Sequence, residues 1–248
     1  MSELRNMYFM KGQYIYEYPH AAITADCVVF GYDTKELKVL LIKRGMEREA
    51  STNAYVGEWA LPGGFMDVLN DNSILHTAVR ELREETGLVL QTDDFREFAT
   101  FSEKDRDPRE RVVTIASYAL VKMSEVQADT DAEKAEWFSL CEVPSLAFDH
   151  DKILRVAFSR LKQDIHFEPV GFDLMPDVFT LPQLQNLYES ILEVKFDRRN
   201  FANKMKHLEI LEEVADGVER KGTRNPIKYK FNKENYERLK KKGFQLEF

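Results

Sequence analysis

Apolar and polar positions in the first 140 residues follow patterns that predict several strands. Two segments rich in β-branched residues, 22–33 and 37–45, are joined by the polar stretch 32–36, which predicts a hairpin. Further strands are expected in EWALPGG, FREFATFS, RVVTIASYALVK and AEWFSL. The charged stretch EKDRDPRE between the second and third of these predicts a loop.

Two segments of this region instead carry apolar residues at helical spacing. The first runs from about Ile74 to Thr86, and Gly87 supplies a C-terminal stop. The second is capped by Asp149 or Asp151. The inward positions expected for the two helices are Leu75, Ala78, Val79 and Leu82, and then Ile153, Leu154, Ala157, Phe158 and Leu161. Antiparallel strands mixed with helices indicate an α+β fold.

The pattern changes beyond a boundary at 163–175. Thr180 and Gln183 form a capping box, and Phe179 and Leu184 are placed for a hydrophobic staple. This predicts a helix with Leu184, Leu187, Tyr188, Ile191 and Leu192 on one face, and a second helix from Asp197 that buries Phe201, Met205 and Leu208. Two strands around a basic loop follow, the second with Ile227, Tyr229 and Phe231 half-buried. This is the element order of a winged helix-turn-helix.

The 248 residues therefore divide into a leader at 1–20, a first domain at 21–165 and a winged helix at 170–248. No run approaches the roughly 18 apolar residues that a membrane span needs. The N-terminus lacks the pattern of a secretory signal, and the two cysteines, Cys27 and Cys141, form no metal-binding spacing. We expect a cytoplasmic protein with reduced thiols and no membrane partner.

The net charge of −8 is unevenly distributed. Residues 1–170 hold 20 basic and 30 acidic side chains, whereas 171–248 hold 15 basic and 13 acidic ones. Within 220–242 there are 10 basic and 2 acidic residues. An acidic body with a basic end suggests nucleic-acid binding, although a solvated lysine-rich terminus gives the same count.

The most specific motif lies around the first predicted helix. Leu61–Phe65, LPGGF, precedes Arg80–Leu88, RELREETGL. Together they resemble the Nudix box, G-x5-E-x7-R-E-U-x-E-E-x-G-U, where U is aliphatic. Glu81, Glu84 and Glu85 share a helix face at i, i+3 and i+4. Such carboxylates suit Mg²⁺ or Mn²⁺, and the resemblance implies that these residues bind metal and that Glu84 and Glu85 serve catalysis.

The first half of the box departs from the family pattern. Gly64 and Arg80 are 16 positions apart where the pattern gives 14. The place of the first glutamate therefore falls on Asn70 or Asn72, and Asp71 can substitute for it if the loop bulges. In the family that glutamate mainly supports the box, so its loss puts efficient hydrolysis in doubt.

Three further stretches resemble one branch of Nudix proteins, the transcription regulators of NAD biosynthesis (NrtR) and arabinose utilisation (AraR). They are RDPR at 106–109, SLAFDH at 145–150 and the 170–211 segment. The resemblance implies a Nudix α/β/α sandwich that binds a small effector, an ADP-ribose-like nucleotide or a sugar, and a homodimer that binds operator DNA. The effector contacts we expect are Arg44, Gly63, Gly64, Phe65, Arg80, Arg106, Arg109 and His150.

The second winged-helix helix carries candidate DNA contacts. Positions 199, 203 and 206 lie about 200° around the helix from the buried ones, so Arg199, Asn203 and Lys206 face away from the core. Arginine and asparagine suit base edges and lysine suits phosphate. The full expected set is Arg198, Arg199, Asn203 and Lys206 with Arg220, Lys221 and Arg224 of the wing.

Three functions follow from these observations. The first is a ligand-sensing transcription regulator. The second is a Mg²⁺-dependent hydrolase of nucleoside diphosphate derivatives such as ADP-ribose, which the intact Arg80–Leu88 segment favours. The third, a DNA-independent interaction module, uses neither the acidic helix face nor the basic wing.

Overall fold

The computed structural model describes residues 20–45, 54–123, 132–168, 171–214 and 226–242. Within these ranges no helix is both long and apolar enough to cross a membrane.

A mixed sheet is centred on β1 (Ala22–Tyr32). β1 pairs in parallel with β6 (Val112–Lys122) and antiparallel with β2 (Leu37–Arg44), which confirms the predicted hairpin. β5 (Phe95–Phe101) lies outside β6, and β7 (Ala132–Ser139) pairs with β2. A 3-10 turn at Thr92–Asp94 leads into β5. The parallel β1–β6 pair, eleven residues on each side, forms the middle of the domain.

The predicted strand EWALPGG is instead two short strands on different partners. β3 (Trp59–Ala60) pairs with β2, and β4 (Gly63–Phe65) pairs with β1. Between them the carbonyl of Pro62 accepts a hydrogen bond from the Cys27 amide. Proline has no N–H to donate, so the ladder breaks there and the chain crosses from one strand to the next. This crossing places the LPGG segment over the centre of the sheet.

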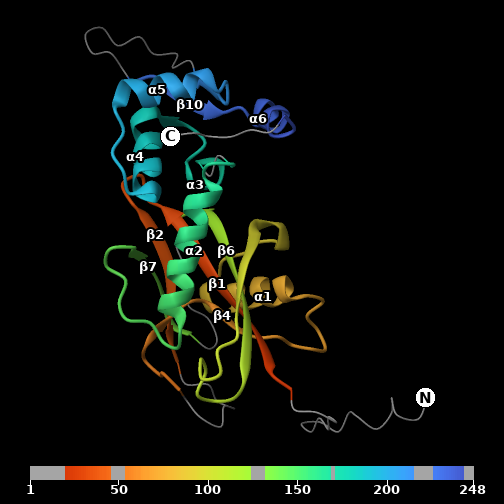
Figure 1. Ribbon diagram of the computed structural model, residues 1–248. Helices are drawn as coiled ribbons and strands as arrows, with labels where there is room; N and C mark the ends of the chain where they lie inside the picture. Colours follow the sequence, from red (N-terminus) through yellow and green to blue (C-terminus); the bar gives the residue numbers. More distant parts are fainter. Residues whose placement is uncertain (1–19, 46–53, 124–131, 169–170, 215–225, 243–248) are drawn as a thin grey trace, which may run out of the picture.

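One helix packs on each face of the sheet, which confirms the α/β/α sandwich (Figure 1). α1 (Ile74–Thr86) lies against Ala25, Cys27 and Val29 of β1, and α2 (His150–Asp164) lies against the alternate residues, including Val28 and Phe30. The bounds of α1 are those predicted: the Ser73 side chain accepts from the His76 amide at its start, and Gly87 ends it with φ 72°.

The expected cap of α2 is only partly correct. Asp149 occupies the N-cap position, but its side chain accepts no capping hydrogen bond. Both of its oxygens accept from Arg106 instead, at 3.1 and 2.7 Å. A carboxylate gains more from a charge-assisted pair than from a backbone amide, so the arginine takes the side chain. The start of α2 is therefore fixed by a contact 43 residues away in sequence.

The C-terminal region is a winged helix. Its elements are α3 (Gly171–Leu174), β8 (Phe179–Thr180), α4 (Leu181–Leu192), α5 (Arg198–His207), β9 (Leu211–Val214), β10 (Lys228–Phe231) and α6 (Lys233–Lys240). The predicted capping box of Thr180 and Gln183 is present at the start of α4. β10 lies between β8 and β9 in a three-stranded sheet. α3, β8 and α6 were not predicted.

One expected core position of this domain is wrong: Ile227 is 53% exposed because β10 begins one residue later, at Lys228. Leu208, the residue that caps α5, is half-buried and packs against the core. Phe201, Met205 and Tyr229 are buried as predicted.

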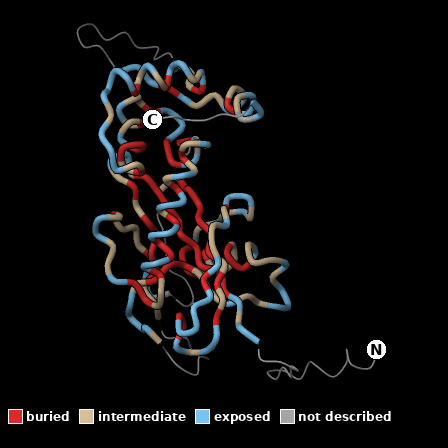
Figure 2. Tube along the Cα trace, viewed as in Figure 1, coloured by how far each residue is buried: buried red, intermediate tan, exposed pale blue. Residues whose placement is uncertain are grey.

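The two domains share one hydrophobic core. Phe30 of β1 and Ile153 of α2 belong to the same buried cluster as Leu184, Tyr188 and Phe201 of the winged helix. Figure 2 shows the buried segments continuing from the strands into the region of α3 and α4. Polar contacts cross the same boundary, since the Tyr32 hydroxyl donates to the Gln183 carbonyl at 3.3 Å and Lys162 of α2 pairs with Glu193 after α4.

The turn between α4 and α5 is held by one carboxylate. Glu189 accepts hydrogen bonds from the Gln185 amide group at 2.8 Å, the Phe196 backbone N–H at 2.9 Å and the Lys195 ammonium at 2.7 Å. Against the opposing effect of burial, these bonds lower the pKa of Glu189 to about 2. The orientation of α5 relative to α4 therefore depends on an ionised Glu189.

Candidate functional site

A pocket of about 590 Å³ opens where β1, β4, α1 and the start of α2 meet. Its size is that of a small-molecule site. Charged and aromatic side chains line it together with the LPGG backbone: Thr24, Asp26, Ile42, Arg44, Gly45, Leu61, Gly63, Gly64, Phe65, Glu81, Glu85, Arg106, Asp107, Arg109, Phe148 and His150.

The two glycines of LPGG let the β4 backbone lie against β1 and α1. A Cβ on Gly63, whose φ is 153°, would meet the Ala25 carbonyl oxygen at 2.2 Å. A Cβ on Gly64 would meet the Glu81 carboxylate at 2.5 Å. With no side chain in the way, the Gly63 N–H donates to Glu85 Oε2 at 2.8 Å. This contact joins the two halves of the Nudix-like motif.

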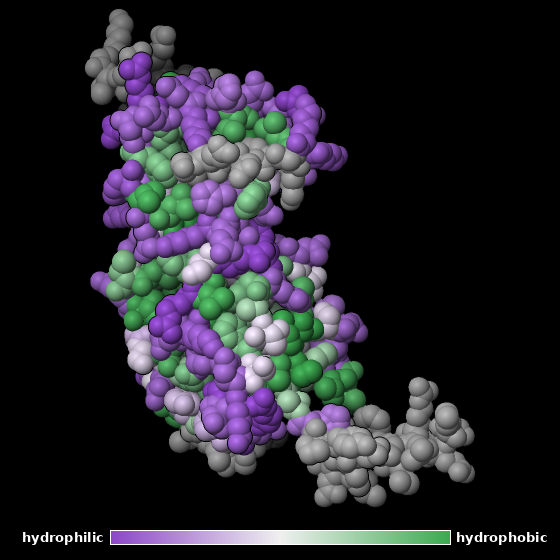
Figure 3. All heavy atoms as spheres, in the orientation of Figure 1, coloured by the Kyte–Doolittle hydropathy of each residue, from purple (hydrophilic) through white to green (hydrophobic). Residues whose placement is uncertain are grey.

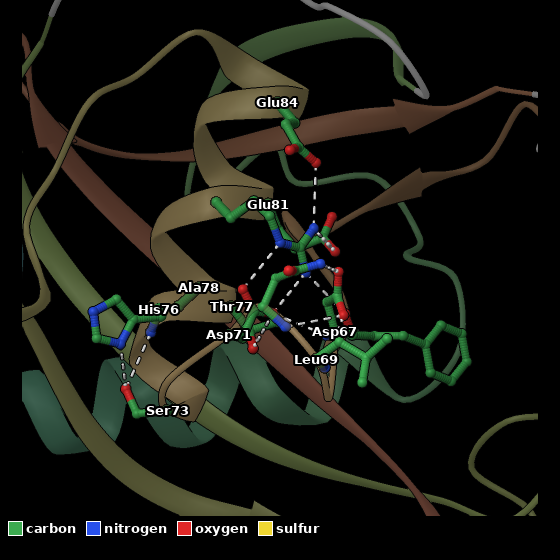
Figure 4. Close-up of polar contacts among 12 residues, drawn as sticks. Asp67, Leu69, Asp71, Ser73, His76, Thr77, Ala78, Glu81 and Glu84 are labelled. Atoms are coloured by element: carbon green, nitrogen blue, oxygen red, sulfur yellow. Dashed lines mark hydrogen bonds and ion pairs between the residues drawn. The ribbon is translucent and has the colours of Figure 1, made fainter. Parts of the chain in front are cut away.

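Asp71 supplies the carboxylate that the box seemed to lack. It accepts from Arg80 Nε at 3.2 Å and Nη2 at 2.9 Å, and from the Thr77 hydroxyl at 2.9 Å. The extra residues form a turn organised by Asp67, whose side chain accepts from the Leu69 and Asn70 amides (Figure 4). The loop bulges, and Asp71 reaches Arg80. The Arg80 hydrogen bond lowers the pKa of Asp71.

Arg80 also holds two of the three predicted metal ligands. Its Nη1 donates to Glu81 at 2.7 Å and to Glu84, one helical turn on, at 3.3 Å. Burial raises the pKa of Glu81, and burial with the neighbouring Glu81 charge raises that of Glu85. Among the described residues no three Asp, Glu, His or Cys side chains form a group that could hold a metal ion. The metal site expected at Glu81, Glu84 and Glu85 stays a prediction; in this structure Arg80 donates to Glu81 and Glu84, and the Gly63 N–H donates to Glu85.

A buried ion-pair network lies deeper in the pocket. Arg106, with a side chain 4% exposed, donates from Nη2 to Asp26 at 3.0 Å and to Asp149 at 2.7 Å. It thereby ties the central strand to the first turn of α2. Buried charges persist only when paired, so this arginine has a structural role at the base of the pocket.

His150 completes the network as a neutral imidazole. Its Nδ1 accepts from the Leu61 N–H at 3.0 Å, which places the ring proton on Nε2, 3.6 Å from Asp26 Oδ1. Burial lowers the pKa of His150, with Arg106 acting in the same direction. The histidine therefore anchors the LPGG segment to α2.

Aromatic and guanidinium groups form one side of the pocket. Phe148 and Tyr55 have left-handed backbones, with φ of 55° and 60°, and their ring centres lie 4.6 Å apart. Such conformations of bulky residues cost about 1–3 kcal/mol each and cluster at ligand-binding sites. Arg44 Cζ lies 5.0 Å from the Phe148 ring centre, within cation–π distance.

All the predicted effector residues except Arg80 line this pocket: Arg44, Gly63, Gly64, Phe65, Arg106, Arg109 and His150. Arg80 instead lies in the Asp71 network. Sequence reasoning missed Asp26, Asp107 and Phe148. Asp26 could have been found as the one acidic residue within an apolar strand, and Phe148 stands in the SLAFDH stretch that carries the family resemblance.

The winged helix exposes the predicted face of α5. Arg198, Arg199, Asn203 and Lys206 are all exposed, and Lys206 Nζ lies 6.0 Å from the Tyr229 ring of β10. On the face drawn in Figure 3, hydrophilic residues predominate over α5. The predicted wing contacts Arg220, Lys221 and Arg224 lie outside the described residues.

Two family models match the chain. The NUDIX domain model matches residues 20–157, and the model of the NrtR DNA-binding winged helix domain matches residues 171–231. The chain is 33% identical over 224 residues to an ADPR responsive transcriptional repressor of Acinetobacter baylyi, covering 89% of this chain and 86% of the relative. It is 38% identical over 138 residues to an ADP-ribose pyrophosphatase of Methanocaldococcus jannaschii, covering 56% and 73%.

Solved structures agree with these matches. The NrtR of Shewanella oneidensis in complex with a 27mer DNA superimposes with a TM-score of 0.67 at 29% identity, over 90% of this chain and 97% of that one. The NUDIX domain of the same protein in complex with ADP ribose gives a TM-score of 0.54 at 31% identity, over 64% and 97%. Both domains and their order are therefore shared.

Proposed function

The chain belongs to the Nudix family and carries an NrtR-type winged helix, and from this premise we propose that it is a transcriptional repressor that responds to ADP-ribose. The observation that carries the proposal is the similarity across both domains to a repressor of that kind. The pocket is the effector site, and α5 is the helix that reads the operator.

The pocket suits a diphosphate ligand. Arg44, Arg106 and Arg109 line it, and guanidinium groups recognise phosphate by paired hydrogen bonds. Arg106 bonds Asp149 at the start of α2, His150 is the first residue of that helix, and its other end contacts the winged helix through Lys162. A ligand in the pocket therefore lies at one end of α2, the helix that contacts both domains.

The DNA-binding role rests on the exposed face of α5. Arg199 and Asn203 have the side chains that recognise guanine and adenine in the major groove, and Lys206 suits phosphate. Arg198 adjoins them, while Arg220, Lys221 and Arg224 stay predictions for the wing. We further propose that the protein binds a two-fold operator as a homodimer, to be tested by light scattering with and without DNA.

The test is fluorescence anisotropy with duplexes from the upstream region of the protein's own gene, with and without ADP-ribose. DNA affinity should fall about 10³- to 10⁵-fold between 50 and 200 mM salt if roughly 6–10 phosphates are contacted. ADP-ribose should change the affinity by tenfold or more. Binding that depends on neither salt nor ADP-ribose would refute the proposal.

Variants sharpen this test. Arg199→Ala should reduce discrimination at one base pair by about 1–3 kcal/mol, whereas Lys221→Ala should weaken all sequences alike. Arg155, exposed on α2, is the matched control, and Arg155→Ala should leave DNA affinity unchanged.

A second candidate function is hydrolysis of ADP-ribose, which the 38% identity to a pyrophosphatase favours. The loop before α1 is longer than in the family pattern, and Asp71 stands in place of the first box glutamate. We therefore expect turnover below the usual range of roughly 1–1,000 per second. A phosphate-release assay with Mg²⁺ or Mn²⁺ decides this, and turnover within that range would place the hydrolase first.

A further inference from the structure

An arginine of the Nudix domain lies at the junction with the winged helix, away from the pocket. Arg96 is the second residue of β5, and its cross-strand neighbour on β6 is Tyr118. Its Nη1 donates to the Tyr118 hydroxyl at 3.3 Å, and its Nη2 lies 2.6 Å from Glu168 and 3.8 Å from Asp173. Glu168 follows α2, and Asp173 belongs to α3. One guanidinium therefore bridges the sheet, the segment between the domains and the winged helix.

The Tyr118 hydroxyl extends this contact to α2. Tyr118 is fully buried, and burial raises the pKa of its hydroxyl, which donates to Asp164 at 2.5 Å. Asp164 is the last residue of α2, and it also accepts from Arg160, one turn earlier in the same helix, at 2.8 and 3.0 Å. The end of α2 is thus bonded to the same arginine through one hydroxyl. We call this group the junction cluster: Arg96, Tyr118, Asp164, Glu168 and Asp173.

The junction cluster is partly shielded from water. The Arg96 and Glu168 side chains are 34% and 31% exposed, so salt screens their ion pair less than one on the open surface. Arg160 pairs with Asp164 inside α2, whereas Arg96 connects β5 to carboxylates of other segments. Arg96 is therefore a charged connection between the sheet and the start of the winged helix.

Helix α2 joins the junction cluster to the pocket. It begins at His150, which lines the pocket, and its 15 residues span about 22 Å to Asp164. Figure 1 shows the helix extending along the sheet toward α3 and α4. Its inner residues Ile153, Ala157 and Leu161 are fully buried, and close-packed interiors transmit strain because they compress little. A shift of the first turn of α2 therefore moves Asp164 as well.

We propose that Arg96 is a positioning residue that couples the effector pocket to the DNA-binding helix, by linking the end of α2 to α3. This inference rests on the proposed function and deepens it, because it names a residue through which the effector alters the orientation of the winged helix. Arg96 is not among the residues that line the described pocket, and it is not on α5. Its contribution is to the response, and it contacts neither ligand.

The experiment measures a coupling factor, the ratio of the Kd for the upstream duplex with saturating ADP-ribose to that without it. Arg96→Met keeps a long side chain and removes the guanidinium. It should move the coupling factor at least about threefold toward one, since substitutions within a coupled network change coupling several-fold. By linkage, the same change must appear in the Kd for ADP-ribose measured with and without DNA. A variant that is only less stable loses active protein, which leaves both ratios unchanged.

Further variants separate the contacts of Arg96. Arg160→Met is the matched control, because it removes a cation from Asp164 within α2, and it should keep the wild-type coupling factor. Tyr118→Phe removes only the hydroxyl between Arg96 and Asp164 and should move the factor toward one. Glu168→Met should do the same. The double variant Arg96→Met, Glu168→Met should lose no more coupling than Arg96→Met alone, because that pair is already broken.

The outcomes separate this inference from the proposed function. If wild-type DNA binding does not respond to ADP-ribose, the proposed function fails. If the wild type responds and Arg96→Met responds equally, or if Arg160→Met loses as much coupling, the positioning role fails and the function stands. If circular dichroism shows that Arg96→Met is unfolded, Tyr118→Phe and Glu168→Met decide, and wild-type coupling factors in both overturn the positioning role.

Discussion

Replacing Arg106 by methionine should strongly destabilise the protein. The change keeps a long apolar side chain and removes the guanidinium that bonds Asp26 and Asp149. The three side chains are 4%, 7% and 18% exposed, so water replaces little of what is lost. Two carboxylates are left in the interior without their cation.

Breaking a buried ion pair by removing one partner costs about 3–5 kcal/mol. For a chain of this size each kcal/mol lowers the melting temperature by roughly 2–4 °C, so the expected fall is about 6–20 °C. The cost arises from the stranded charges. Neutralising them with Asp26→Asn and Asp149→Asn in the Arg106→Met background should therefore recover about 1–2 kcal/mol.

Urea unfolding followed by circular dichroism measures these differences. Arg160→Met is the matched control, because Arg160 is 47% exposed and pairs with Asp164 one helical turn away. That pair should contribute only about 0.3–0.5 kcal/mol. If Arg106→Met is no less stable than Arg160→Met, or if the neutralising substitutions deepen the loss, the network does not hold α2 as argued.

Three further predictions concern His150, Glu189 and the carboxylates of α1. Because the pKa of His150 in the folded protein lies below its ordinary value of 6.5, the unfolded chain takes up the proton first as the pH falls. The free energy of unfolding of the wild type should therefore decrease below about pH 6.5. In urea titrations at several pH values, His150→Gln should make this free energy depend less steeply on pH. Glu189 has a pKa of about 2 in the folded protein, so it stabilises the fold at pH values above its ordinary pKa of 4.5, and this stabilisation is lost between about pH 4.5 and 2. Glu189→Gln should lower the free energy of unfolding by roughly 1–2 kcal/mol at pH 7. Equal hydrogen-exchange protection of α5 in the variant and the wild type would contradict this. Titration calorimetry with Mn²⁺ should show weaker binding for a Glu84→Gln, Glu85→Gln variant than for wild type, because the variant removes two of the three predicted metal ligands. Identical isotherms would remove the predicted site.

Local signals sufficed where an element is determined by its own residues. α1 was predicted in full because its cap, its apolar stripe and Gly87 all lie within the segment. The exposure of Arg199 and Asn203 followed from helical periodicity alone. Local signals failed where a residue distant in sequence determines the contact or the start of an element. Nothing near Asp149 indicates that Arg106 takes its side chain, and nothing near Ile227 indicates where β10 begins to pair.

The site shows the same division. The carboxylates of α1 were identifiable by spacing, but whether they are open to metal depends on how the 66–73 loop brings Asp71 to Arg80. Asp26, Asp107 and Phe148 converge only after the sheet has formed, since they come from different elements. The unpredicted α6 carries an Asn232 cap, which the lysine-rich composition around it obscured.

The shared core has a thermodynamic consequence for signalling. Phe30, Ile153 and Leu184 belong to one cluster, so opening the winged helix exposes apolar surface of the Nudix domain as well. A ligand that binds only the folded protein stabilises it by RT ln(1 + [L]/Kd), about 2.7 kcal/mol at a hundredfold excess over Kd. Amide protons of α4 that exchange through global unfolding should then be protected by a ligand bound at the far end of α2. The Nudix domain and the winged helix therefore affect each other's stability, even before any change of shape.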